Sequence, residues 1–271
     1  MMSFGKDRLA LGGILLLGIL LIVAMTAPWL VLSDPFQIHL PDALLPPSPA
    51  HWLGTDQLGR DVLARLMYGA RVSLSVGFIA VAIAVVVGVI VGAIAGFYGG
   101  WIDAVLMRLV DTLLSIPTIF LLFAVIAIVG PSIQVVMVVI GLTSWMGLSR
   151  LVRAEILSLK ERDFVLAARI MGASPWWIIT RHLVPNAMGP VLVSATLSVG
   201  GAILLESVLS YFGLGVQPPT PSWGNMLNEG RIALGVAWWL TMSPGLCIFV
   251  TVLAFNFVGE GLRERLSRDD T

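Results

Sequence analysis

One acidic side chain, Glu206, stands inside a long apolar stretch of the sequence, residues 191–214. An ionisable group at such a depth in a membrane is costly unless it faces protein or a water-filled path. We expect the Glu206 carboxylate either to line a path or a gate, or to form a structural hydrogen bond to a partner subunit. In a path it could meet an amine or a chelated cation. The sequence leaves both interpretations open.

A second candidate for a path or gate is Pro117, which lies within the apolar stretch 104–129. Proline removes one helix hydrogen bond, so we expect a bend there that could help a gate to open. Three charged residues precede it around the start of this stretch, which we expect at the cytoplasmic side: Asp103, Arg108 and Asp111. Arg108 and Asp111 are three residues apart and can share one helix face, so we interpret them as interfacial anchors or a local ion pair.

Residues for catalysis or nucleotide binding are missing from the sequence. A phosphate-binding P-loop needs a lysine followed by Ser or Thr, and neither Lys6 nor Lys160 is followed by either. The three histidines, His39, His51 and His182, are too scattered to form one metal site. The sequence therefore predicts no enzyme activity and no cofactor or metal bound by this chain. The formal net charge is zero, which gives no reason to expect a nucleic-acid partner.

The composition indicates that lipid surrounds these residues. Hydrophobic residues make up 58% of the 271 positions and charged residues only 12%, about half the share in soluble proteins. A membrane-spanning helix needs about 20 apolar residues. Six stretches qualify or nearly do: 9–32, 72–96, 104–129, 133–152, 191–214 and 232–258. The sequence therefore predicts an all-α polytopic membrane protein with about six transmembrane helices.

The distribution of basic residues predicts the orientation. With a cytoplasmic N-terminus, twelve of the sixteen Lys and Arg residues fall in inside segments and four in outside segments. Six spans then place both termini in the cytoplasm. We interpret the first stretch as an uncleaved span, because it is longer than the apolar region of a signal peptide. The single cysteine, Cys247, permits no disulfide within the chain.

Two longer segments remain outside the bilayer. The outer one, 33–71, begins with a proline-rich irregular part. It continues as residues 60–68, whose apolar spacing predicts a short amphipathic helix at the membrane surface with Arg60 and Arg65 on another face. We therefore divide the chain into residues 1–71, a first span plus outer segment, and a five-helix core, 72–271, which includes the cytoplasmic loop 153–190.

The cytoplasmic loop has the signals of two short helices. The first is predicted over 158–171 and ends at Gly172. Ser174 and Pro175 then suit the N-cap and first turn of a second helix, which we expect to end before Pro185. Ala167 and Ala168 would allow another surface to approach closely, and the adjacent Trp176 and Trp177 are costly to leave in water. The loop either docks a cytoplasmic protein or packs under its own bundle.

A family resemblance favours docking. Residues 163–174 read DFVLAARIMGAS and continue to Pro185 and Asn186, which resembles the EAA loop of ABC importer permeases. In that family the loop forms coupling helices that contact the ATPase. Ala167, Ala168 and Gly172 match the pattern, whereas Leu166 stands where the family has Glu. The resemblance implies coupling roles for the matching residues, for Pro185 and Asn186, and for Asp163, one turn before Leu166.

Three further stretches resemble the dipeptide, oligopeptide and nickel permeases, specifically their second or C subunit. They are HWLGTDQLGRD at 51–61, DTLLSIP at 111–117, and ESVLSYFGLG at 206–215 with PPTPSWG at 218–224. The resemblance implies a type I ABC importer permease fold in a bacterial inner membrane. It also implies four kinds of contact: a homologous second permease, two ATPases that hold ATP and Mg, an outer solute-binding protein, and membrane lipid.

The solute is less well determined by the resemblance. Di- and oligopeptides are our first expectation, with nickel, other metal chelates or opines as the alternative. A self-sufficient channel or secondary carrier is a rival of another class, although we find none of the internal repeats that such carriers often have. Finally, Gly88, Gly92 and Gly96 form a ladder of small residues that allows close helix packing, against a helix that the sequence does not identify.

Overall fold

The protein is a bundle of long helices. The computed structural model describes residues 3–31 and 33–269, and within these ranges the one β pairing is a bridge between Thr55 and Asp61. The elements in chain order are α1 Ser3–Leu30, the 3-10 turn η1 Leu40–Asp42, α2 Val62–Tyr98, α3 Gly100–Leu114, α4 Thr118–Val129, α5 Ile133–Leu159, α6 Asp163–Ile170, α7 Pro175–Ile178, the π-helical turn η2 Ile179–Leu183, α8 Val184–Tyr211, α9 Trp223–Arg231 and α10 Trp239–Asp269.

The prediction of about six spans is confirmed. Within the described residues, five helical segments are long and apolar enough to cross a membrane: Arg8–Leu30, Val62–Tyr98, Ile133–Leu159, Pro175–Tyr211 and Trp239–Leu266. The pair α3 and α4, which meet at an angle of 84°, is the sixth candidate when the two helices are counted as one bent span. Leu32, the last residue of the predicted first span, lies outside the described residues.

The glycine ladder of α2 packs against α5. A Cβ atom at Gly92 would lie 2.5 Å from the backbone oxygen of Ser149 and 2.7 Å from Cβ of Val152. Gly88 and Gly96 approach α5 as closely, one turn to either side. Small residues let two backbones come together where lipid gives no hydrophobic drive for association. The structure thus identifies the partner helix that the sequence left open.

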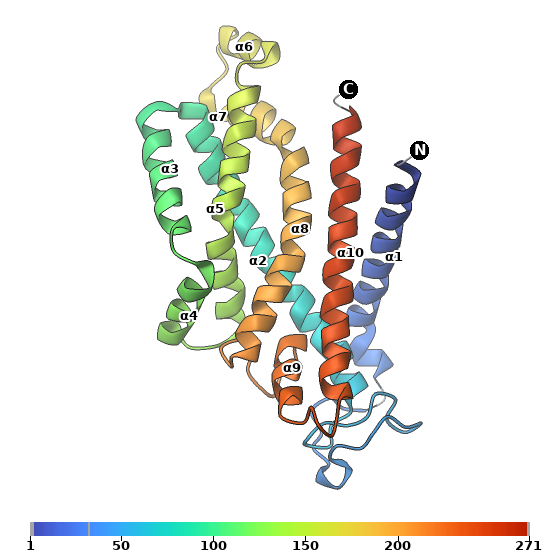
Figure 1. Ribbon diagram of the computed structural model, residues 1–271. Helices are drawn as coiled ribbons and strands as arrows, with labels where there is room; N and C mark the ends of the chain where they lie inside the picture. Colours follow the sequence, from blue (N-terminus) through green and yellow to red (C-terminus); the bar gives the residue numbers. More distant parts are fainter. Residues whose placement is uncertain (1–2, 32, 270–271) are drawn as a thin grey trace.

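The two ends of the bundle differ (Figure 1). Both termini lie at the same end as α6, whereas α9 and the irregular outer segment lie at the opposite end. We call these the coupling end and the α9 end. α1 packs against α10, and α8 contacts both α2 and α10. The order of the elements therefore brings the loop 153–190 to the end that carries the termini, as the predicted topology requires.

Two sequence predictions about helix boundaries are wrong. Residues 60–68 do not form a separate surface helix, because α2 begins at Val62 and continues to Tyr98. Arg60 and Arg65 are 6% and 1% exposed rather than at the surface. Carboxylates from elsewhere in the chain surround both guanidinium groups, which makes their burial possible.

The second wrong boundary is at Pro185, where the helix was expected to end. The segment is helical from Pro175 to Tyr211 because the turn η2 precedes the proline. In η2 the Val184 N–H donates to the Ile179 oxygen, five residues back. This wider turn shifts the hydrogen bonding just before the residue that has no N–H, so the helix passes through it.

Candidate coupling surface and transport path

Gly172 sits at the turn between α6 and α7, at the coupling end. Its φ of 81° lies in the left-handed region that favours glycine. The Gly172 N–H donates to the Arg169 oxygen and the Ala173 N–H to the Ala168 oxygen, each at 3.0 Å. These two bonds form the Schellman motif that ends a helix. The predicted stop at Gly172 is confirmed, with α6 itself shorter than the helix expected over 158–171.

The start of α7 also follows the predicted signals. The Ser174 hydroxyl accepts a hydrogen bond from the Trp177 N–H, and Pro175 occupies the first turn. Ala168, which is 2% exposed, faces inward and packs in one cluster with Val165 and Ile178. The two alanines of the motif therefore differ in position, because Ala167 is exposed. The loop therefore both packs against its own bundle, through Ala168, and presents an outward surface, through Ala167.

The outward surface of α6 and α7 is strongly apolar. We define the coupling face as Leu166, Ala167, Ile170, Met171, Trp176 and Trp177, all of them exposed. Ile170 and Met171 are 87% and 80% exposed, and Trp176 is 72% exposed. Leu166, in the position of the family's Glu, is 40% exposed. Such a patch at a polar end of the bundle marks an interaction site, because large apolar side chains are costly to leave in water.

Asp163, Pro185 and Asn186 flank the coupling face. Asp163 is exposed in the first turn of α6, where a carboxylate suits the helix N-terminus. Pro185 and Asn186 are exposed in the first turn of α8, and the Asn186 amide donates to the His182 oxygen at 2.6 Å. The His182 ring lies 4.7 Å from the Trp177 ring, between centroids. These contacts connect the start of α8 to α7.

Glu206 is fully buried in a network of serines. Its carboxylate accepts hydrogen bonds from Ser210 at 2.6 Å, from Ser222 at 2.8 Å and, more weakly, from Ser73 at 3.5 Å. Ser73 also accepts from the backbone N–H of Trp223. The network joins α2, α8 and the start of α9. The hydrogen bonds come from serines of the same chain, and the side chain has no exposed surface in this structure.

Pro117 stands at the break between α3 and α4. It is the N-cap of α4, and the break produces the 84° angle between the two helices. The predicted bend is thus confirmed, whereas a part in gating stays a prediction. Asp111 does not pair with Arg108: its ion-pair partner is Arg150 of α5. Asp103, in the first turn of α3, also pairs with an arginine of α5, Arg153, at 2.5 Å.

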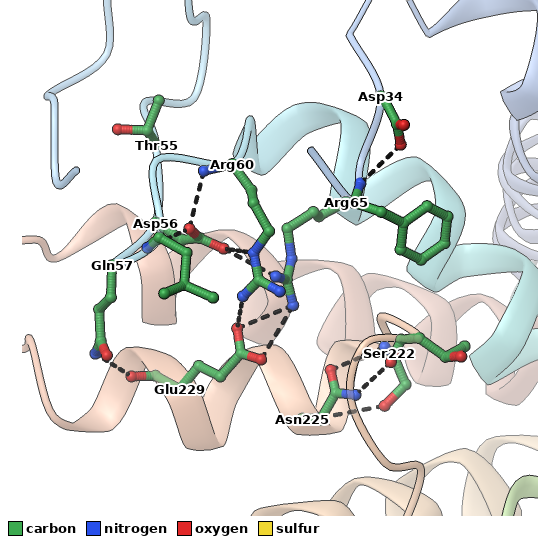
Figure 2. Close-up of polar contacts among 12 residues, drawn as sticks. Asp34, Thr55, Asp56, Gln57, Arg60, Arg65, Ser222, Asn225 and Glu229 are labelled. Carbon is green, nitrogen blue, oxygen red and sulfur yellow. Dashed lines mark hydrogen bonds and ion pairs between the residues drawn. The ribbon is translucent and has the colours of Figure 1, made fainter. Parts of the chain in front are cut away.

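A buried ionic cluster at the α9 end escaped the sequence reasoning (Figure 2). Asp56 accepts from Arg60 at 2.6 Å and from Arg65 at 2.8 Å. Both arginines also reach the Glu229 carboxylate, at 3.1 and 2.9 Å. The Gln57 amide donates to the Glu229 backbone oxygen at 2.9 Å. Burial raises the pKa of the Glu229 carboxyl, and the charge of Arg60 opposes that shift.

The comparisons with known proteins agree with this geometry. Residues 88–269 match the family described as the binding-protein-dependent transport system inner membrane component. The chain belongs to this family. Residues 1–47 of the permease match the N-terminal transmembrane domain of oligopeptide transport permease C. The resemblance to the C subunits of the dipeptide and oligopeptide ABC permeases is therefore confirmed.

Several curated relatives resemble the permease over nearly its whole length. A dipeptide transport system permease protein of Alkalihalophilus pseudofirmus is 41% identical, over 96% of this chain and 86% of the relative. A putative peptide permease protein of Brucella suis is 44% identical, with 96% and 87% covered. A glutathione transport system permease protein of Escherichia coli is 41% identical, with 97% and 87% covered.

Solved structures confirm the fold. The permease resembles a chain of the MetNI methionine ABC transporter in an inward-facing conformation, with a TM-score of 0.57 and 21% identity. The match covers 76% of this chain and 96% of that chain. A chain of an amino acid ABC transporter matches with the same TM-score and 16% identity. The permease therefore has the type I ABC importer permease fold.

Proposed function

We propose that this permease carries di- and oligopeptides into the cell as one of two related permease subunits of an ATP-driven importer in the bacterial inner membrane. The observation that carries the proposal is the similarity, over 96–97% of the chain, to relatives named as dipeptide, peptide and glutathione permeases.

The coupling face supports the second part of the proposal, which concerns energy supply. We assign the ATP and Mg to two separate ATPase subunits, because the chain has no P-loop. Ile170, Met171 and Trp176 would insert into a complementary apolar cleft on such a subunit, with Asp163 beside them. The Gly172 turn fixes the angle between the two short helices and so the shape presented to the ATPase.

The path from this surface to the membrane is short. Trp177 and His182 join α7 to the start of α8, where Pro185 and Asn186 lie. α8 then carries Glu206. Closure of the ATPases around ATP would favour the conformation that they bind more tightly, since a ligand shifts such an equilibrium only through differential affinity. In this scheme α8 carries the shift, and Pro117 and Glu206 are our candidates for positions that respond to it.

The orientation is also part of the proposal. The termini and α6 share one end of the bundle (Figure 1), and most of the basic residues fall in the segments of that end. We therefore place the coupling end in the cytoplasm. The α9 end would then face an extracytoplasmic solute-binding protein, which delivers the peptide.

A tagged pull-down from mild-detergent membranes, with mass spectrometry of the co-purifying chains, tests the assembly. We expect a second multi-span permease and P-loop ATPases. Vesicles of the complex whose coupling side faces the lumen, with the co-purifying binding protein added outside, should take up trialanine only when ATP is present inside. Purification of this chain alone, with uptake that needs no ATP, would contradict the proposal. Uptake of nickel rather than trialanine would overturn the choice of solute.

A further inference from the structure

A cavity of about 820 Å³ opens at the coupling end between α5, α8 and α10. This volume lies within the range of about 300–1,000 Å³ that is typical of small-ligand sites. We call it the inner cavity. Its polar lining residues are Glu155 and Ser158 of α5, Arg162 of the following turn, Asn186 and Ser194 of α8, and Arg263 of α10.

Glu155 is the unusual member of this lining. Three ionisable residues occupy the last turns of α5, and two of them, Arg150 and Arg153, form ion pairs with α3. Glu155 points to a different side of the helix and lines the inner cavity. Within the described residues it has neither a hydrogen bond nor an ion pair. Glu155 lies in the last turns of α5, on the wall of a cavity where a few placed polar groups can orient a ligand, so its carboxylate is free to bind a cationic group.

The other walls of the inner cavity carry a cationic group and two hydroxyls. Among the described residues, Arg263 of α10 has one ion-pair contact, 3.9 Å to Glu260, and the two side chains are 71% and 48% exposed. An exposed pair at that distance contributes little, so the guanidinium is available to another anion. The hydroxyls of Ser158 and Ser194 have no hydrogen-bond partner within the part of the chain that the structure describes. They add donors and acceptors between the two charges.

We propose that the inner cavity is a release site for the transported peptide, in which Glu155 binds the α-ammonium group and Arg263 faces the carboxylate end. This inference rests on the proposed function, since it gives the solute a place in the path. The complementary charges come from different helices, so a zwitterionic peptide would bridge α5 and α10. Binding would be weak, because the cavity is open to water and water screens both charges. Weak binding suits a site from which the solute must leave.

The first test compares charge variants in vesicles of the complete complex with its binding protein. For Glu155→Gln we expect trialanine uptake at saturation to fall about fivefold, the effect of one weak charge contact in water. KM should change less, because the binding protein captures the solute, and ATP hydrolysis should continue. Glu155→Asp should restore at least half of the uptake. Glu161→Gln, which removes an exposed carboxylate outside the cavity, is the matched control.

The second test reads occupancy of the cavity rather than transport. Cys247 is the only cysteine of the chain, so a Cys247→Ser background allows single labelling sites. Cysteines placed by Glu155→Cys and Ser194→Cys should react with a thiosulfonate reagent from the coupling side. Excess trialanine added to the outer, coupling side of inverted vesicles should slow both reactions, because a bound peptide would cover both positions. Glu161→Cys, outside the cavity, should react at the same rate with or without the peptide.

The outcomes separate the two levels of the proposal. The release site would be overturned if Glu155→Gln took up trialanine as fast as the wild type, or if trialanine protected neither cysteine. Either result would leave peptide import intact. Failure of the wild-type complex to take up any peptide would overturn both. Loss of uptake in Glu155→Gln together with a loss of ATP hydrolysis would also contradict the inference, because it would assign Glu155 to coupling.

Discussion

The guanidinium of Arg65 lies 2.9 Å from the carboxylate of Glu229, although 164 positions separate the two residues in the sequence. This contact ties the start of α2 to α9 at the α9 end of the bundle. Asp56 and Arg60 complete the cluster, so the outer segment, α2 and α9 share one buried ionic centre (Figure 2). The ionic cluster holds together the surface that we assign to the solute-binding protein.

Replacing Arg65 should therefore destabilise the permease. Arg65→Met leaves the Asp56 and Glu229 carboxylates with Arg60 alone, and breaking a buried pair costs about 3 kcal/mol or more. We expect a clearly lower Tm for the detergent-solubilised complex, measured by thermal unfolding. Arg71→Gln, which removes an exposed arginine from the same helix, should leave Tm nearly unchanged. Equal Tm values for the Arg65→Met and wild-type complexes would show that the cluster contributes no net stability.

Two variants of Glu206 distinguish a structural role of the side chain from a role of its charge in the path. Glu206→Gln keeps an oxygen that can accept from Ser210 and Ser222, so the protein should remain folded. Glu206→Leu strands these buried hydroxyls, at about 1–3 kcal/mol for each unsatisfied group, and should lower the Tm and the yield. If Glu206 also acts in the path, Glu206→Gln should lose uptake without losing stability. Unaltered uptake by Glu206→Gln at normal expression would leave the residue a structural role only.

The turn at Gly172 should be sensitive to any side chain. With φ at 81°, an added Cβ costs about 1–2 kcal/mol even though no other atoms lie within 4 Å of its position. Gly172→Asp also adds a charge beside the apolar coupling face. We expect ATP-driven uptake to be largely lost while the permease still inserts in the membrane. Gly201→Ala, at a helical position with equal space, is the control. Full uptake by Gly172→Asp would contradict a coupling role for this turn.

Close packing between α2 and α5 gives a further prediction. Gly92→Ala would place a methyl group 2.5 Å from the Ser149 backbone oxygen, so the helices must separate. Overpacking of this kind costs about 1–3 kcal/mol. We expect a lower yield of folded permease and a lower Tm. Gly147→Ala on α5 meets nothing within 4 Å and should behave as wild type. A normal Tm for Gly92→Ala would show that the interface is looser than the structure indicates.

Local signals in the sequence predicted the coupling loop well. Gly172, Ser174 and Pro175 act through the backbone of their own neighbours, so their effects can be read within a few residues. The bend at Pro117 was predictable for the same reason. By contrast, the fate of Pro185 depended on the π-helical turn before it, which has no comparable sequence signal. A proline alone therefore indicated a helix end that the structure does not have.

Long-range contacts were beyond the same reasoning. Arg60 and Arg65 have the spacing of a surface helix, and their burial follows from Glu229, which the fold brings from 169 and 164 positions away. Glu206 was correctly singled out as a costly group, yet two of its serine partners, Ser73 and Ser222, come from other elements. The pairing of Asp111 with Arg150 instead of Arg108 has the same origin. Each case depends on which helices meet, and amphipathic spacing does not encode that.

The π-helical turn before Pro185 has a consequence for the transmission of force. It makes the 37 residues Pro175–Tyr211 continuous, and at 1.5 Å per residue they span about 55 Å. One end bears on the coupling face and the other on the Glu206 serine network. A flexible tether transmits only tension, whereas a helix also transmits tilt and rotation, here through one proline inside α8, Pro190. A small swing of Trp176 and Trp177 at one side of the membrane would thus become a displacement at the other.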